Sequence, residues 1–176
     1  PSTATSSALG GAFAHLGGSN GDTSFTIVAF TGNYAYSDAA ASGGAIYADQ
    51  PVRITLGDAA ATATAGFTAF SGNYATTDSN VATAVAQGGV VYVGAGTDLT
   101  VNKYSSFSNN YAEASASGTL ASARGGALYL TDGTKAALGQ DISFTGNYTS
   151  VNGNGPSQGG AIYVAANALA IDTATF

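Results

Sequence analysis

The sequence predicts an all-β fold, a parallel β-helix (β-solenoid) of about five coils with three short strands in each coil. Two recurring phrases carry this prediction. One is F-x-x-N, which occurs at Phe30, Phe70, Phe107 and Phe144, and Phe176 stands where a fifth copy would begin. The other is a Gly pair followed by alternating apolar residues, at Gly10, Gly43, Gly88, Gly125 and Gly159. The two phrases alternate strictly along the chain, and such self-similarity indicates a repeat architecture.

Each repeat shows the pattern of three strands separated by turns. The Gly pair opens the first strand, in which Ile46 would face one side and Tyr47 the other, and this period of two residues is typical of a strand. A second strand follows at 52–56, and the third contains F-x-x-N. The spacing of the Gly pairs is not constant, and it is longest between Gly43 and Gly88. We interpret the segments 58–66 and 76–87, where this spacing varies, as loops of different length.

Composition favours strands over a mostly helical fold. Apolar residues make up 45% of the 176 residues, which is enough to form a core, whereas charged residues make up only 8%. An ordinary soluble domain contains about 25% charged residues. Glu113 is the only Glu, and Lys103 and Lys135 are the only Lys, so the charged residues on which helical surfaces depend are scarce.

The charge balance excludes two classes of partner. The net charge is −6, and the only basic residues besides Lys103 and Lys135 are Arg53 and Arg124, so we expect no nucleic-acid partner. An anionic membrane surface also requires clustered basic residues, and no run of 18 apolar residues is present, so we expect no membrane insertion. The chain has no Cys, Met or Trp, a composition that suits an extracellular or cell-surface location. Without Cys, neither a disulfide nor a thiolate metal site can form.

Stacked coils place like side chains above one another, at the spacing of about 4.8 Å between neighbouring strands. We therefore expect an aromatic stack inside the solenoid, formed by Phe30, Phe70, Phe107, Phe144 and Phe176. We expect a hydrogen-bonded ladder at the bend after that strand, formed by Asn33, Asn73, Asn110 and Asn147. We expect an outward tyrosine stripe next to the Gly pairs, which either is covered by loops or serves as a contact surface for carbohydrate or another protein: Tyr47, Tyr92, Tyr129 and Tyr163. A second tyrosine set follows the Asn ladder: Tyr34, Tyr74, Tyr111 and Tyr148.

The phrases GGAIY, at Gly43 and Gly159, and FTGNY, at Phe30 and Phe144, resemble the repeats of chlamydial polymorphic outer-membrane proteins. More broadly, they resemble the passengers of autotransporter adhesins. This resemblance covers 10–176 and implies a right-handed parallel β-helix that is exposed at a cell surface. It is specific for the fold and gives little information about the function. The Ala-rich loops of the chain depart from the resemblance.

No constellation of residues in the sequence supports catalysis or holds a cofactor. His15 is the only His, and there is no Cys to join it in a site. The aspartates are scattered, mostly in turns, unlike the Asp clusters of β-helix pectin lyases and hydrolases. Asp49, Asp132 and Asp98 could lie near one turn beside Arg53, which leaves weak calcium binding open. We predict that the chain is not an enzyme and has no catalytic residue, cofactor or metal site.

The sequence favours a non-catalytic extracellular protein with a structural or adhesive role. The alternative is a passenger fragment of an autotransporter-like adhesin that binds host or carbohydrate ligands. Two further functions rank lower. A carbohydrate-active β-helix enzyme would need residues that are absent, and an ice-binding solenoid would need Thr at one fixed position across the coils.

The expected domain organisation is an N-terminal segment, 1–9, followed by one β-helix domain, 10–176. The end coils carry no evident cap, and bare strand edges template further pairing. We therefore predict head-to-tail self-assembly into a surface filament, in which residues 1–9 complete the last coil of a neighbouring copy. The competing interpretation is that the chain is an excerpt of a longer adhesin passenger.

Overall fold

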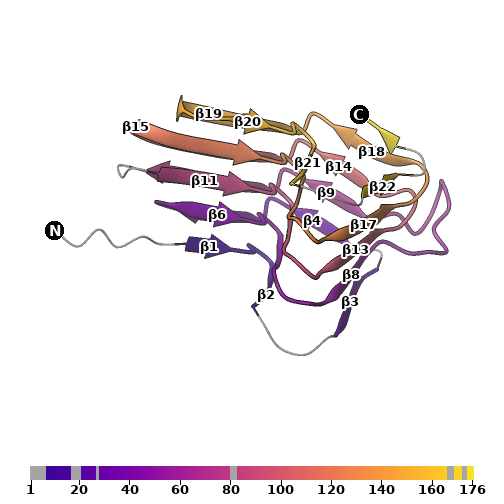
Figure 1. The fold of residues 1–176 in the computed structure, drawn as a ribbon. Helices are drawn as coiled ribbons and strands as arrows, with labels where there is room; N and C mark the ends of the chain where they lie inside the picture. Colours follow the sequence, from indigo (N-terminus) through magenta and orange to yellow (C-terminus); the bar gives the residue numbers. More distant parts are fainter. Residues whose placement is uncertain (1–6, 17–20, 27, 80–82, 166–168, 172–173) are drawn as a thin grey trace.

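The computed structural model describes residues 7–16, 21–26, 28–79, 83–165, 169–171 and 174–176. Within these ranges the regular structure consists of β-strands, all strand pairs are parallel, and no helix could span a membrane. The strands stack into a β-solenoid (Figure 1), which confirms the predicted fold class. The solenoid has about four turns, slightly fewer than the five coils predicted.

Three sheets of five strands each enclose the core, as the three-strand pattern predicts. The first contains the strands that follow the Gly pairs: β2 (Phe13–His15), β7 (Ile46–Ala48), β12 (Val91–Val93), β16 (Leu128–Leu130) and β21 (Ile162–Val164). The second contains β3 (Asp22–Phe25), β8 (Arg53–Leu56), β13 (Asp98–Val101), β17 (Lys135–Leu138) and β22 (Leu169–Ile171). The third contains β4 (Ala29–Thr31), β9 (Ala69–Ser71), β14 (Ser106–Ser108), β18 (Ile142–Thr145) and β23 (Ala174–Thr175).

Strict register places equivalent residues of neighbouring coils side by side. Val91 lies between Ile46 and Leu128, and Phe107 lies between Phe70 and Phe144. The side chains that point inward from the three sheets form one buried cluster, whose largest members are Phe70, Phe107, Phe144, Ile46, Ile54, Leu56, Leu99, Leu128, Leu130 and Ile142. The repeated phrases therefore build a continuous core along the solenoid axis.

A fourth sheet of eight strands projects from this body as an arm (Figure 1). The prediction that residues 76–87 form a loop is wrong for 76–79 and 83–87, which lie in strands of this sheet, and residues 80–82 lie outside the described ranges. The outgoing layer of the sheet contains β5 (Tyr34–Ser37), β10 (Tyr74–Ser79), the first half of β15 (Tyr111–Arg124) and β19 (Tyr148–Asn154). Its returning layer contains β1 (Ser7–Leu9), β6 (Ala40–Ser42), β11 (Thr83–Gln87), the second half of β15 and β20 (Ser157–Gln158). Segment 58–66 does form a loop, with one isolated bridge between Thr62 and Ala65.

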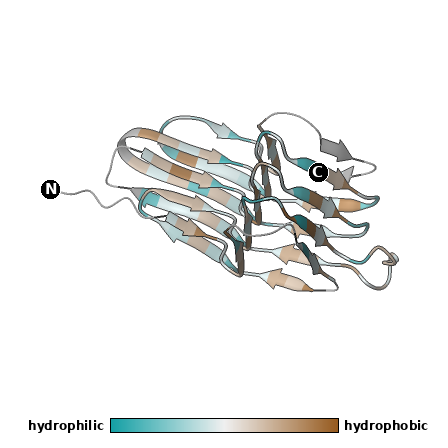
Figure 2. Ribbon diagram, turned by 60° about the horizontal axis from the view of Figure 1, so that its bottom comes forward, coloured by the Kyte–Doolittle hydropathy of each residue, from teal (hydrophilic) through white to brown (hydrophobic). Residues whose placement is uncertain are grey.

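Alanine explains why the arm folds. Apolar and polar residues alternate along its strands (Figure 2). Buried alanines of both layers form two clusters: Ala84, Ala86, Ala112, Ala114, Ala116, Ala121 and Ala123, and, nearer the first coil, Ala35, Ala41 and Ala75. A methyl group fills little space, so the two layers pack against each other closely and leave no room for larger side chains. The segments that depart from the resemblance are thus a second, alanine-filled core.

A larger side chain inside the arm should therefore destabilise it. Ala114 is completely buried, whereas the neighbouring Ser115 faces the other side of β15 and is partly exposed. We expect Ala114→Val to lower the free energy of unfolding by about 1–3 kcal/mol through overpacking, measured by chemical denaturation. Ser115→Val is the matched control and should change it by less than about 0.5 kcal/mol. Equal effects of the two changes would contradict close packing between the layers.

Candidate interaction surface

An asparagine corner connects four strands of the third sheet, β4, β9, β14 and β18, to the arm. The four asparagines named above, Asn33, Asn73, Asn110 and Asn147, lie there in one row. At the central step, the Asn73 amide nitrogen Nδ2 donates to Oδ1 of Asn110 at 3.0 Å and to the Phe30 carbonyl at 2.8 Å. The backbone N–H of Asn73 also donates to Oδ1 of Asn110, at 2.9 Å. Each corner therefore fixes the direction in which the next arm strand leaves the body.

The residue before each of these asparagines adopts a left-handed backbone. Gly32, Gly72 and Gly146 have φ angles of 64°, 62° and 64°. At the third corner Asn109 takes this place with a φ of 54°. Asn is among the few non-Gly residues that tolerate this conformation, which explains why the phrase reads FSNN there without a change of geometry.

Removing one asparagine should be costly although the residue carries no charge. Asn110 is fully buried, and Asn110→Ala leaves the Asn73 N–H and the Phe70 carbonyl without their partners. Each unsatisfied buried group costs about 1–3 kcal/mol, so we expect a loss of about 2–3 kcal/mol in the free energy of unfolding. Asn152→Ala, on the exposed part of β19, is the control. A neutral result for Asn110→Ala would show that the ladder does not support the corner.

The phenylalanines lie in a stack beneath the corners. Ring centroids are 5.2 Å apart between Phe30 and Phe70, 4.6 Å between Phe70 and Phe107, 4.8 Å between Phe107 and Phe144, and 5.3 Å between Phe144 and Phe176. The three central rings are buried and Phe176 is 69% exposed. These rings fill the core and offer no surface to a ligand along the body of the solenoid.

Two further phenylalanines extend the stack into the first coil. Phe13 contacts Phe25 edge to face at 5.3 Å, and Phe25 contacts Phe30 in the same way at 5.2 Å. Sequence reasoning missed this cluster. The available signal was that Phe13 and Phe25 occupy the positions of Ile46 and Leu56 in the next coil.

The tyrosine stripe predicted as a contact surface is mostly covered. Tyr47, Tyr92, Tyr129 and Tyr163 stack at 4.7–5.2 Å, but Tyr47 and Tyr129 are only 7% exposed. The Tyr47 hydroxyl donates to the Asp49 carboxylate at 2.7 Å. Burial raises the pKa of Tyr92 to about 12 and raises the pKa of Tyr47 as well, so both phenols stay protonated at neutral pH. The expected exposed stripe is therefore not found at Tyr47 and Tyr129.

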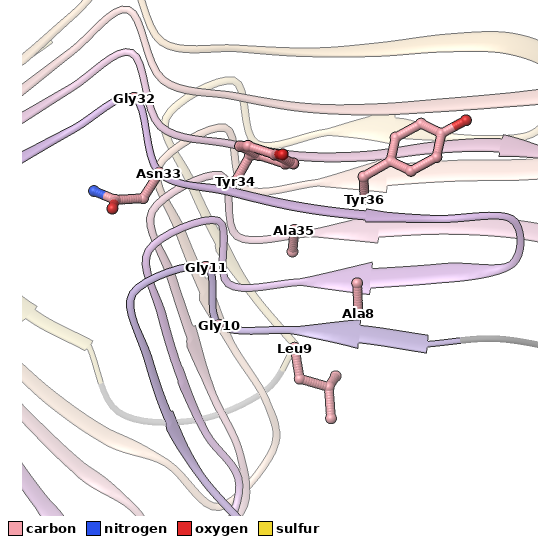
Figure 3. A pocket seen from close by; sticks show the side chains of 9 residues that line it. All are labelled: Ala8, Leu9, Gly10, Gly11, Gly32, Asn33, Tyr34, Ala35 and Tyr36. Carbon is pink, nitrogen blue, oxygen red and sulfur yellow. The ribbon is translucent and has the colours of Figure 1, made fainter.

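The second tyrosine set is the exposed one. Tyr34, Tyr74, Tyr111 and Tyr148 stack along the outgoing layer at 4.8–5.2 Å, and Tyr34 and Tyr148 are 56% and 46% exposed. Tyr34 and Tyr36 lie on one side of β5, and Ala35 lies on the other (Figure 3). We call this side of the outgoing layer the outer arm face; it carries Tyr34, Tyr36, Tyr74, Thr76, Tyr111, Glu113 and Tyr148. Because stacked rings cover each other's faces, the tyrosine ladder presents ring edges and hydroxyls to solvent.

The charged side chains do not gather into a catalytic or metal site within the described ranges. Arg53 pairs with Asp22 at 3.1 Å, with both side chains exposed, rather than with Asp49 or Asp132. In register on the second sheet, Asp98 lies between Arg53 and Lys135, so the charges alternate from coil to coil. No group of three or more His, Asp or Glu residues in this part of the chain could hold a metal ion.

His15, the only His, lies at the end of β2 beside Ala48, and its Nε2 atom is buried without a hydrogen-bond partner in the described structure. Asn147 precedes Tyr148 and Thr149 in a glycosylation sequence, but its amide donates to the Phe107 carbonyl at 2.9 Å and accepts from Asn110. The Asn147 amide therefore has a structural role in this corner.

Two shallow hollows flank the outgoing layer. One, of about 570 Å³, opens below the first coil and is lined by Ala8, Leu9, Gly10, Gly11, Gly32, Asn33, Tyr34, Ala35 and Tyr36 (Figure 3). The other, of about 330 Å³, lies on the outer arm face and is lined by Tyr36, Thr76, Thr77, Asp78, Glu113 and Ser115. Both are open to solvent, and both border Tyr36.

Comparison with known families supports the resemblance seen in the phrases. Residues 27–49 and 141–165 match the Chlamydia polymorphic membrane protein repeat. Each matched segment runs from a strand of the third sheet through the asparagine corner and the arm to the strand after the Gly pair. Comparisons with curated proteins and with solved structures gave no significant match.

Arm length separates the matched coils from the two central ones. The stretch from the Phe of F-x-x-N to the next Gly pair is shorter in the matched coils, at 30–43 and 144–159, than in the central coils, at 70–88 and 107–125. The corners of the central coils have the same hydrogen bonds as the others. The two coils with longer arms are therefore not matched by the family repeat, although their asparagine corners have the same geometry as those of the matched coils.

Proposed function

We propose that this chain is a non-catalytic, extracellular structural and adhesive β-solenoid, which presents the outer arm face to a partner at a cell surface. The observation that carries the proposal is the match of two coils to a surface-protein repeat in a fold whose arms expose a tyrosine ladder. Single exposed aromatic residues are common on proteins, but a continuous row marks an interaction site. The dispersed titratable residues of the described structure favour this role over catalysis.

The chemistry of the outer arm face narrows the partner. The net charge of −6 disfavours anionic glycans and nucleic acids. Stacking of sugar rings requires an open aromatic face, and the two central rings of the ladder, Tyr74 and Tyr111, are covered by a neighbouring ring on both faces. A polypeptide partner that packs across ring edges and bonds to the phenol hydroxyls suits this surface better than a carbohydrate does.

Adhesion of coated beads to cultured epithelial cells tests the proposal. We expect the double change Tyr74→Thr with Tyr111→Thr to lower bead binding by about tenfold, because it removes the centre of the ladder, where interface energy concentrates. The matched control is Thr55→Ala with Thr100→Ala, at half-buried positions of β8 and β13. Circular dichroism checks that both variants stay folded. If wild-type beads do not bind, or if the tyrosine variant binds as well as the control, the proposal is wrong.

Self-assembly is a second candidate function, which the partly exposed phenylalanines of the first and last coils favour. Phe176 is 69% exposed, and Phe13, Phe25 and Phe30 are only partly buried at the opposite end. We propose that copies stack head to tail, with residues 1–9 of one copy completing the last coil of its neighbour. Sedimentation velocity at rising concentration should show growing species that Phe176→Asp and deletion of residues 1–9 both suppress. A chain that stays monomeric at high concentration would rule this assembly out.

A further inference from the structure

Tyr36 differs from every other arm tyrosine in the described structure because its ring has no aromatic neighbour. The row of Tyr34 continues as tyrosine in each coil, whereas the row of Tyr36 continues as Thr76, Glu113 and Ser150. Tyr36 takes part in none of the ring stacks of the described residues, and it is 52% exposed. Its ring projects from the outer side of β5 (Figure 3), so one aromatic face is open on the outer arm face.

The open ring borders the hollow over Thr76. Tyr36 lies on β5, Thr76 on the adjacent β10 and Glu113 on β15, so the Cα atoms of Tyr36 and Glu113 are two strand spacings apart, or about 9–10 Å. The short Thr76 side chain between them forms the floor, and Asp78 and Ser115 complete the rim. The hollow thus has an aromatic ring on β5 and carboxylates on β10 and β15.

Within the described residues, neither Asp78 nor Glu113 forms an ion pair with a basic side chain. Arg53 pairs with Asp22 on the second sheet. Arg124, in the returning layer, bonds to Gln158 and lies over the ring of Tyr163. Lys135 is the first residue of β17, and Lys103 lies over the ring of Tyr104. These are all the basic side chains of the chain. Asp78 and Glu113 therefore place negative charge on the outer arm face, and no basic side chain of the described structure neutralises this charge.

We infer that this hollow binds the guanidinium group of an arginine on a partner polypeptide. The inference rests on the adhesive role proposed above and names the chemistry of its partner. A guanidinium lies within about 6 Å of the centroid of an aromatic ring on which it stacks. Its far edge then donates to a carboxylate over about 3 Å. Together these distances span the gap between Tyr36 and Glu113.

Arginine fits this hollow better than the other cations. The planar guanidinium stacks on a ring and bonds to a carboxylate at the same time, whereas the lysine ammonium is compact and strongly hydrated. A bound metal ion would need more ligands, and no suitable group of three occurs in the described residues. The hydroxyls of Thr76 and Ser115 can accept the remaining N–H groups.

Titration of the isotope-labelled chain with N-acetyl-arginine amide, followed by NMR, tests the inference. We expect shifts at the amides of Thr76 and Glu113, and weaker binding of N-acetyl-lysine amide. Glu113→Gln and Tyr36→Leu should each raise the Kd by about fivefold. Asp141→Asn is the matched control: it removes the same charge from an exposed turn on another side of the molecule and should leave the Kd unchanged.

The outcomes separate this inference from the proposed function. If Glu113→Gln and Asp141→Asn bind arginine amide equally, the interaction is a general effect of net charge and the inference is wrong. If lysine amide binds as tightly as arginine amide, the proposed stacking of the guanidinium group on the Tyr36 ring is wrong. Bead adhesion that persists in Glu113→Gln would overturn the inference and leave the adhesive role intact. Arginine binding without bead adhesion would overturn the adhesive role instead.

Discussion

Phe107→Ala is expected to lower the free energy of unfolding by about 3–5 kcal/mol, the usual cost of truncating a buried Phe. Phe107 is completely buried in the middle of the stack, with Phe70 and Phe144 at 4.6 Å and 4.8 Å on its two sides. The flanking rings are held by their own strands and cannot close the gap. The truncation therefore loses both ring contacts and leaves a cavity, which chemical denaturation measures.

The control for this change is Phe67→Ala. Phe67 is 54% exposed and lies outside the stack, so the same truncation should cost less than about 1 kcal/mol. If Phe107→Ala costs no more than Phe67→Ala, the F-x-x-N phrase would be a surface motif rather than the core of the solenoid.

Gly89→Ala is expected to cost about 3 kcal/mol or more, although it adds a single methyl group. A Cβ atom at position 89 would overlap the carbonyl oxygens of Gly126, in the next coil, and of Tyr111, at the start of an arm strand. Both obstacles are backbone atoms, and the N–H groups of the same two residues bond to neighbouring coils, Gly126 to Gly159 and Tyr111 to Asn73, so neither residue can move without disturbing the stack. Thermal unfolding should show a large fall in Tm.

Gly160→Ala is the matched control for this prediction. Gly160 is the second residue of its own Gly pair, but the nearest atom to an added Cβ is the Asn147 carbonyl oxygen at 3.5 Å, an ordinary contact. We expect a change of less than about 0.5 kcal/mol. Similar losses for the two variants would mean that the second Gly of each pair serves the turn itself rather than the close approach of the next coil.

The body of the solenoid could be predicted because its signals are local and repeated. Phe107 and Asn110 recur with the same neighbours in each coil, and a parallel stack then has one register that aligns them. The arm could not be predicted in the same way. Ala114 carries little hydrophobic signal, and its alternation with polar residues is significant only when an opposite alanine layer is present. That layer comes from other parts of the chain, which the sequence does not place.

The choice between the two tyrosine ladders also depended on tertiary structure. The alternation after the Gly pairs predicts an outward side chain for Tyr129, whereas the sequence says of Tyr111 only that it follows the Asn ladder. Tyr129 is nevertheless 7% exposed, with Arg124 from the returning layer close to its neighbour Tyr163, whereas Tyr111 lies on the free side of the outgoing layer. Only the position of the arm decides which ladder remains accessible.

The central claim is that the arm is a packed part of the solenoid and therefore a fixed surface for a partner. Hydrogen exchange of the backbone amides in β15 tests this claim most directly. We predict that the amides of Ala112, Ala114 and Ala123 exchange at least about 1,000-fold more slowly than in an unstructured peptide, because each lies in a parallel ladder and packs in the alanine cluster. Exchange within seconds at these positions, together with protection of Phe107 in the body, would contradict it.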